Sequence, residues 1–242
     1  MLVAKSEQWR KCAGCLKGHP AFILGNGPLL PRNLLPLDGF FTVGVNRIWL
    51  PPKDVDWPGD MPWYDPIVVQ WTDNEIERDV ASRMRNSQSV VFIRDAINYL
   101  KKNPLIPYGS SQSPCHHPLA SPEFVPATGN MGTAAALWAM TLGCSPVYLL
   151  GMSSHYMQKD DGTLTNYYGV NKHHNGPSKR RMENALSELL KLEGVYPVLD
   201  YDAMEAVTGA LWQLRMGREF YIDTFRRCHA SVHLGQQPVA AC

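Results

Sequence analysis

Glycine and asparagine follow the first apolar segment of the chain, in the tetrapeptide Gly25-Asn26-Gly27-Pro28. A glycine turn after a strand lets backbone N–H groups approach a phosphate or a ribose, because no Cβ blocks the way. The Asn26 amide both donates and accepts, which suits ribose hydroxyls or a phosphoryl oxygen. The turn is neither G-x-G-x-x-G nor a Walker loop, and Asn-Gly-Pro is also ordinary turn chemistry. We interpret this turn as the place where the phosphate or sugar of a nucleotide binds.

Two further segments carry polar groups to the same predicted edge. Asn46 and Arg47 end the second apolar segment, where they can contact a sugar or base, although Asn46 can instead cap the following turn. Thr128-Gly129-Asn130 opens an apolar helix, whose first N–H groups and positive dipole end attract an anion. The alternative for Thr128 is a plain helix cap.

Histidines, tyrosines and a lysine gather after the fifth apolar segment. An imidazole is suited to act as a general base near neutral pH, while phenol and ammonium groups bind phosphate oxygens. These residues add candidate bases and phosphate ligands to the site: His155, Tyr156, Tyr168, His173, His174 and Lys179.

The elements that must position these groups are short apolar strands alternating with helices. Because several strand segments are apolar throughout, they are expected to be covered on both faces. The predicted strands are Ala21–Leu24, Phe40–Val45, Pro66–Gln70, Ser89–Ile93, Pro146–Leu150 and Tyr196–Leu199. Helices are predicted over Thr128–Leu142 and Ser178–Glu193, with one or two more over Asp202–Arg227. This alternation predicts an α/β fold with a doubly wound, mostly parallel, Rossmann-like sheet.

Two long proline-rich segments interrupt this alternation, at Leu50–Pro66 and Asn103–Pro126. We interpret them as ordered loops that form a lid over the ligand. The predicted organisation is an N-terminal extension (1–20), a nucleotide-binding domain (21–207), and C-terminal helices with a tail (208–242).

Taken together, the motifs resemble a known group of enzymes. The segments are Gly25-Asn26-Gly27-Pro28, Val45-Asn46-Arg47, Thr128-Gly129-Asn130-Met131-Gly132, Leu149-Leu150-Gly151 and Gly176-Pro177-Ser178-Lys179. Their order and spacing over Ala21–Val207 resemble the Rossmann-like bacterial sialyltransferases that use CMP-sialate. They are equally similar to the 6-hydroxymethylpterin diphosphokinase-like proteins, which are common in phage and surface-polysaccharide clusters.

The resemblance implies roles for particular residues. It implies that Asn26 and Asn46 contact a nucleotide sugar, and that Tyr156 with Tyr167 or Tyr168 holds the donor phosphate. Two departures matter: an acidic residue of that family is replaced by Ser153 or Ser154, and its general-base histidine falls on Pro177. His173 or His174 is then the replacement base.

Three functions remain open from the sequence. The leading hypothesis is a transferase with a nucleotide-activated donor, a glycosyltransferase acting on a glycan, a small molecule or a modified DNA base. It requires no metal, because no DxD-like motif follows a suitable strand. The second is an ATP-dependent diphosphokinase, which would need magnesium held by Asp73, Glu75 and Asp95. The third is a nucleotide-binding protein without catalysis.

Composition and charge favour a small-molecule partner. The net charge of +1 gives no overall attraction to nucleic acid or anionic membrane. A local basic cluster is interpreted as a solvated helix face, and the alternative is that it holds a polyanionic acceptor such as DNA. The cluster consists of Arg215, Arg218, Arg226, Arg227, His229 and His233. We expect a cytoplasmic protein without a membrane span, and a homo-oligomer is compatible with the sequence.

Six cysteines do not form an evident disulfide framework. Cys12-Ala13-Gly14-Cys15 has the spacing of half a zinc site, and Cys115-His116-His117 would supply the other half. The favoured alternative is that Cys12 and Cys15 are ordinary thiols near a mobile N-terminus.

Overall fold

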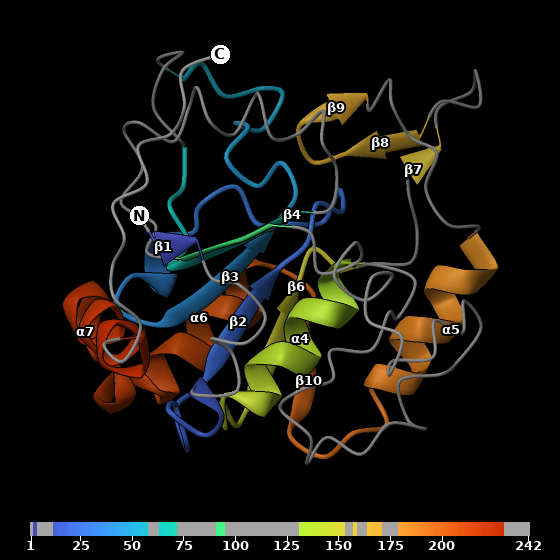
Figure 1. Cartoon of the computed structure of the whole chain (residues 1–242). Helices are drawn as coiled ribbons and strands as arrows, with labels where there is room; N and C mark the ends of the chain where they lie inside the picture. Colours follow the sequence, from blue (N-terminus) through green and yellow to red (C-terminus); the bar gives the residue numbers. More distant parts are fainter. Residues whose placement is uncertain are drawn as a thin grey trace, which may run out of the picture.

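The computed structural model describes residues 2–3, 12–57, 63–71, 91–94, 131–152, 157–158, 164–170 and 179–229. Within these ranges, seven strands form one sheet in which every neighbouring pair is parallel (Figure 1). Its strands are β1 (Leu2–Val3), β2 (Ala21–Leu24), β3 (Phe41–Val45), β4 (Val68–Trp71), β5 (Val91–Arg94), β6 (Val147–Leu150) and β10 (Val195–Val198). Each of the six predicted strand segments overlaps one of these strands, with ends that differ by at most two residues, and the predicted α/β class is confirmed.

The helices also follow the sequence pattern. The described helices are α4 (Met131–Thr141), α5 (Lys179–Leu189), α6 (Tyr201–Ala210) and α7 (Gly217–His229), with 3-10 turns η2 (Leu35–Leu37) and η5 (Trp212–Leu214). The α6 helix begins where the Asp200 carboxylate accepts a hydrogen bond from the Ala203 N–H at 2.8 Å. The described residues of Leu50–Pro66 contain no helix or strand, as predicted, whereas Asn103–Pro126 lies outside the described residues.

The strand order is β1-β5-β4-β3-β2-β6-β10. From β2 the chain adds β3, β4 and β5 on one side, and then returns to the other side of β2 with β6 and β10. The order therefore reverses between β2 and β6. The register places Leu24 beside both Gly44 in β3 and Leu150 in β6, so these three strands end at the same level.

Both faces of the central strands are buried. Ala21 and Ile23 of β2 belong to one apolar core, with α4 and α7, and Phe22 and Leu24 belong to the other, with η2 and α6. In Figure 1, α4 lies in front of β2 and β6, and α6 lies behind them. Because successive side chains of a strand point to opposite faces, a strand that is apolar throughout contributes to both cores.

The N-terminal segment packs on the same core as the strands. The N–H groups of Gly14 and Leu16 donate to the carbonyls of Thr141 and Leu142 at 3.1 and 2.8 Å, and Leu16 is fully buried. The β1 strand pairs with β5 at the edge of the sheet. The described parts of residues 1–20 thus contribute to the sheet and its core.

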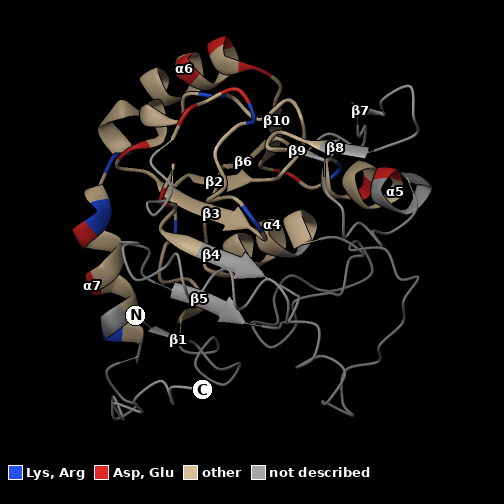
Figure 2. Ribbon diagram, turned by 90° about the horizontal axis from the view of Figure 1, so that it is seen from above, with Lys and Arg blue, Asp and Glu red and all other residues tan. Residues whose placement is uncertain are grey.

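The C-terminal helix α7 closes one face of the sheet. Tyr221 and Phe225 are buried, and their rings lie 5.5 and 5.9 Å from the ring of Phe41 in β3. The described part of the predicted C-terminal segment thus also packs against the sheet. Figure 2 shows charged residues along α6 and α7, whereas α4, β2, β3 and β6 carry none.

A second, antiparallel sheet lies beyond the carboxyl ends of the main strands (Figure 1). It consists of β7 (Met157–Gln158), β8 (Leu164–Asn166) and β9 (Gly169–Val170). The β8–β9 turn is joined to the main sheet where the Tyr167 N–H donates to the Asn26 carbonyl at 3.2 Å. Among the described helices, none has the length and apolar character needed to cross a membrane.

Candidate functional site

The site is built at the carboxyl ends of β2, β3 and β6, next to the reversal of strand order. In parallel α/β sheets, ligands bind outside the carboxyl ends of the strands at such a reversal. The predicted residues Gly25, Asn26 and Gly27 follow β2, while Asn46 and Arg47 follow β3. The structure therefore brings these five residues to one edge.

The glycine turn is packed backbone to backbone against the end of β6. The Gly25 N–H donates to the Leu150 carbonyl and the Gly27 N–H to the Gly151 carbonyl, both at 2.8 Å. A Cβ on Gly25 would lie 2.5 Å from the Gly151 carbonyl oxygen, and a Cβ on Gly151 would lie 2.7 Å from the Gly25 oxygen. These glycines allow two chain segments to touch, and the N–H groups of Gly25 and Gly27 are bound within the protein instead of facing a phosphate.

Asn26 links β2 to β3. Its Nδ2 donates to the Val45 carbonyl at 3.1 Å, which fixes the orientation of the amide, because a carbonyl only accepts hydrogen bonds. Its Oδ1 is buried and has no hydrogen-bond partner in the part of the chain that the structure describes. The Asn26 amide is thus held in place through its Nδ2, and its Oδ1 is left as a hydrogen-bond acceptor.

Asn46 occupies the equivalent position after β3. Its φ of 51° lies in the left-handed region, where asparagine is among the better tolerated residues. As with Asn26, its Oδ1 is buried and lacks a partner among the described residues. We call the Oδ1 atoms of Asn26 and Asn46 the two buried acceptor oxygens.

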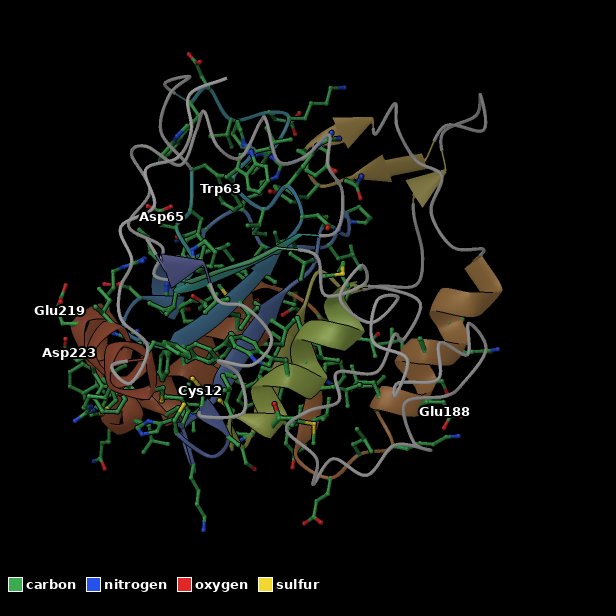
Figure 3. The ribbon with its side chains drawn as sticks, viewed as in Figure 1. Cys12, Trp63, Asp65, Glu188, Glu219 and Asp223 are labelled. Atoms are coloured by element: carbon green, nitrogen blue, oxygen red, sulfur yellow. The ribbon has the colours of Figure 1, made fainter. Side chains whose placement is uncertain are left out.

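Tyr167 fixes the loop that carries Arg47. Its hydroxyl lies 3.1, 2.7 and 2.8 Å from the carbonyl oxygens of Arg47, Ile48 and Leu50. The Trp63 Nε1 donates to the Ile48 carbonyl at 2.6 Å and lies 3.3 Å from the Tyr167 hydroxyl. Burial raises the pKa of Tyr167 well above its ordinary value, so the hydroxyl stays protonated and can donate. Trp63 is labelled in Figure 3.

This geometry changes the interpretation of the tyrosines. The resemblance offers Tyr167 or Tyr168 as a phosphate ligand, but the Tyr167 hydroxyl is engaged by backbone carbonyls. Tyr168 is half-buried, accepts a hydrogen bond from Asn166 Nδ2 at 3.0 Å, and packs edge-on against Tyr167 with ring centres 5.1 Å apart. The sequence places Trp63 in an ordered loop without predicting its contact with Tyr167, because the two residues are far apart in the chain.

Several predicted site residues are not placed by the structure. Lys179 is the first residue of α5, but the structure does not describe its side chain. The predicted bases and the remaining nucleotide contacts also lie outside the described residues: His155, His173, His174, Tyr156, Thr128, Gly129 and Asn130. The same is true of the predicted magnesium ligands Asp73, Glu75 and Asp95, and of Cys115-His116-His117.

Two arginines of the C-terminal basic cluster are engaged with the protein itself. Arg215 donates to the Pro36 carbonyl at 2.8 Å and stacks over the Phe40 ring at 5.2 Å. Arg218 donates to the Asp65 carbonyl. These contacts fix both guanidinium groups to loops beside the sheet. They give Arg215 and Arg218 a structural role.

The described residues contain no candidate metal centre. Within the ranges given above, no group of three or more His, Cys, Asp or Glu side chains is arranged to hold a metal ion. The groups that the described part of the site offers to a ligand are hydrogen-bonding amides and backbone groups.

Comparison with known proteins identifies no relative of this chain. No family model matches the chain, and no curated protein or solved structure is significantly similar to it.

Proposed function

We propose that this chain binds a nucleotide at the carboxyl ends of β2, β3 and β6, in a doubly wound, Rossmann-like domain with a proline-rich lid. The strand-order reversal between β2 and β6 supports this location. The observation that carries the proposal is the pair of buried acceptor oxygens, on Asn26 and Asn46, at the ends of two neighbouring strands.

The two buried acceptor oxygens determine which part of the nucleotide binds there. A buried amide oxygen that lacks a donor costs about 1–3 kcal/mol, and a ligand that donates to it recovers this energy. Phosphate oxygens only accept at neutral pH, whereas ribose hydroxyls and base amino groups donate. Asn26 and Asn46 therefore bind the sugar or the base of the nucleotide.

The phosphate binds elsewhere in this proposal. The N–H groups of Gly25 and Gly27 are occupied by β6 and Gly151. The last carbonyls of α4 contact residues that precede β2, so the first turn of α4 points toward the carboxyl edge. A helix N-terminus attracts phosphate through its N–H groups and its dipole, and we assign the phosphate to the start of α4, with Thr128, Gly129 and Asn130.

The reaction proposed for this site is transfer from a nucleotide-activated donor, with a sugar as the transferred group. A histidine among His155, His173 and His174 takes the proton from the acceptor hydroxyl, whose oxygen attacks the anomeric carbon. The bond to the nucleotide phosphate breaks, and Tyr156 and Lys179 stabilise the departing phosphate. This transfer requires no metal.

A nucleotide screen tests the proposal. CMP, CDP, UDP, ADP, GDP and the corresponding triphosphates are each added to the purified chain, and the melting temperature is measured. We expect at least one of them to raise the melting temperature, because a ligand that binds the folded state stabilises it. If none does so at millimolar concentration, the nucleotide proposal is contradicted.

Turnover then separates the possible reactions. Release of free nucleotide from a nucleotide sugar, with acceptor present, supports the transferase. Transfer of diphosphate from ATP that depends on magnesium would instead indicate the diphosphokinase. Binding without turnover of any donor would indicate a binding protein.

A further inference from the structure

Three cysteines from opposite ends of the described chain meet beside α7. Cys12 and Cys15 lie in the turn before β2, where the Cys15 N–H donates to the Cys12 carbonyl at 3.0 Å. Cys228 lies in the last turn of α7. Cys12, which is labelled in Figure 3, is only 3% exposed, while Cys15 and Cys228 are half-buried at the edge of the same core. We call these residues the thiol cluster.

The side chains of the thiol cluster interact with one another. The thiols of Cys12 and Cys228 both act as donors toward the Cys15 sulfur. A thiol is a weak donor, and two such donors directed at one sulfur favour its thiolate form.

The three sulfurs are therefore not equivalent. The hydrogen bond from Cys12 lowers the pKa of Cys15, and the bond from Cys228 lowers it further; burial raises this pKa, but the net direction is below the ordinary value. The pKa of Cys12 is raised, first by its bond to Cys15 and then by burial. Burial raises the pKa of Cys228. Cys15 is also the member that combines partial exposure with stabilisation of the thiolate, which is the environment of reactive cysteines.

We propose that Cys15 is a redox-reactive thiolate and that Cys12 is its resolving partner. The Cys15 sulfur attacks a peroxide, so that an S–O bond forms, the O–O bond breaks, and the departing hydroxide takes up a proton to give water. Cys12 then loses its proton and attacks the Cys15 sulfur, the S–S bond forms, and the second hydroxide leaves as water. Two thiols and one hydrogen peroxide become one disulfide and two waters. Cys228 does not enter the disulfide and serves as the second hydrogen-bond donor to Cys15.

A disulfide is favoured over a metal centre at this cluster. The thiol cluster lies within the described residues, and in that part of the chain no group of three or more metal-ligating side chains is arranged around an ion site. The Cys-x-x-Cys spacing, by contrast, is typical of cysteines that react with each other.

The test compares alkylation rates at single cysteines in the full chain. Cys115 and Cys242, which lie outside the described residues, are replaced by serine, and iodoacetamide labelling at neutral pH is followed by peptide mapping. We expect Cys15 to react at least tenfold faster than Cys144, because Cys144 is 4% exposed and burial raises its pKa. This measurement requires no change within the thiol cluster.

Oxidation then identifies the resolving partner. Treatment with one equivalent of hydrogen peroxide is expected to give a Cys12–Cys15 disulfide, and Cys228→Ser is expected to give the same disulfide more slowly. In Cys12→Ser, a sulfenic acid at Cys15 is expected to accumulate and to be trapped by dimedone. A Cys15–Cys228 disulfide, equal labelling of Cys15 and Cys144, or stoichiometric zinc bound by the purified chain and lost in Cys15→Ser would overturn the proposal.

Discussion

Replacement of Gly25 by alanine is expected to lower the free energy of unfolding by about 2–3 kcal/mol, the size of an overpacking defect in a well-packed interior. The new Cβ would lie 2.5 Å from the Gly151 carbonyl oxygen and 3.0 Å from its carbon. Because these are backbone atoms, they cannot swing away as the end of a side chain can. The two hydrogen bonds that join this turn to β6 and Gly151 must then lengthen as the segments separate.

The same substitution at Gly209 is the matched control. Gly209 lies in α6, and apart from its chain neighbours and the backbone of its own helix no described heavy atom lies within 4 Å of the position its Cβ would take. Gly209→Ala is expected to leave stability unchanged or to raise it by up to about 1 kcal/mol, since alanine favours helix. Urea denaturation of both variants measures the difference. An unchanged unfolding free energy in Gly25→Ala would show that the β2 and β6 ends do not pack as described.

Tyr167→Phe is expected to cost about 1–3 kcal/mol, because a buried group loses its hydrogen-bond partner. The ring and its packing remain, but the carbonyl oxygens of Arg47, Ile48 and Leu50 lose the hydroxyl. The Ile48 carbonyl still accepts a hydrogen bond from Trp63 Nε1, and the Arg47 carbonyl still accepts one from the Leu50 N–H. The expected local result is faster amide hydrogen exchange in residues 46–50, together with weaker nucleotide binding.

Tyr196→Phe provides the comparison for this loss of a hydroxyl. Tyr196 lies in β10 and is 50% exposed, so water replaces its hydroxyl contacts. Its substitution is expected to change stability by less than about 0.5 kcal/mol, as is usual for surface positions. Equal stability losses in the two variants would contradict the clamping role assigned to Tyr167.

Six strands of the main sheet were predictable, because each is a short apolar segment bounded by glycine, proline or a polar residue. The two-residue strand β1 and the strands β7, β8 and β9 of the antiparallel sheet were not predicted. The meeting of Asn26 and Asn46 was also predictable, since both follow strands that neighbour each other in a parallel sheet. The role of Gly25 was not. A glycine needed for a phosphate and a glycine needed for close backbone contact look the same in sequence, and the contact here is with Gly151, far along the chain.

The N-terminal segment shows a second limit of sequence reasoning. Cys12 and Leu16 are buried against the main core, yet residues 12–20 form turns without a helical or strand period. The hydrogen bonds that hold them go to the end of α4, a partner that no local pattern indicates. For the same reason, the approach of Cys228 to the Cys12-Cys15 turn could be seen only in the structure.

The central claim is that the two buried acceptor oxygens bind the sugar or base of a nucleotide, and Asn46→Gly tests it most directly. Glycine accepts the φ of 51° without strain, so the variant removes the amide and leaves the backbone as it is. Asn26 is less suitable, because its amide also donates to Val45. Calorimetric titration of the nucleotide found in the screen is expected to show affinity weaker by about tenfold or more, or about 1.4 kcal/mol, in a variant with unchanged secondary structure. Wild-type affinity in Asn46→Gly would contradict the account.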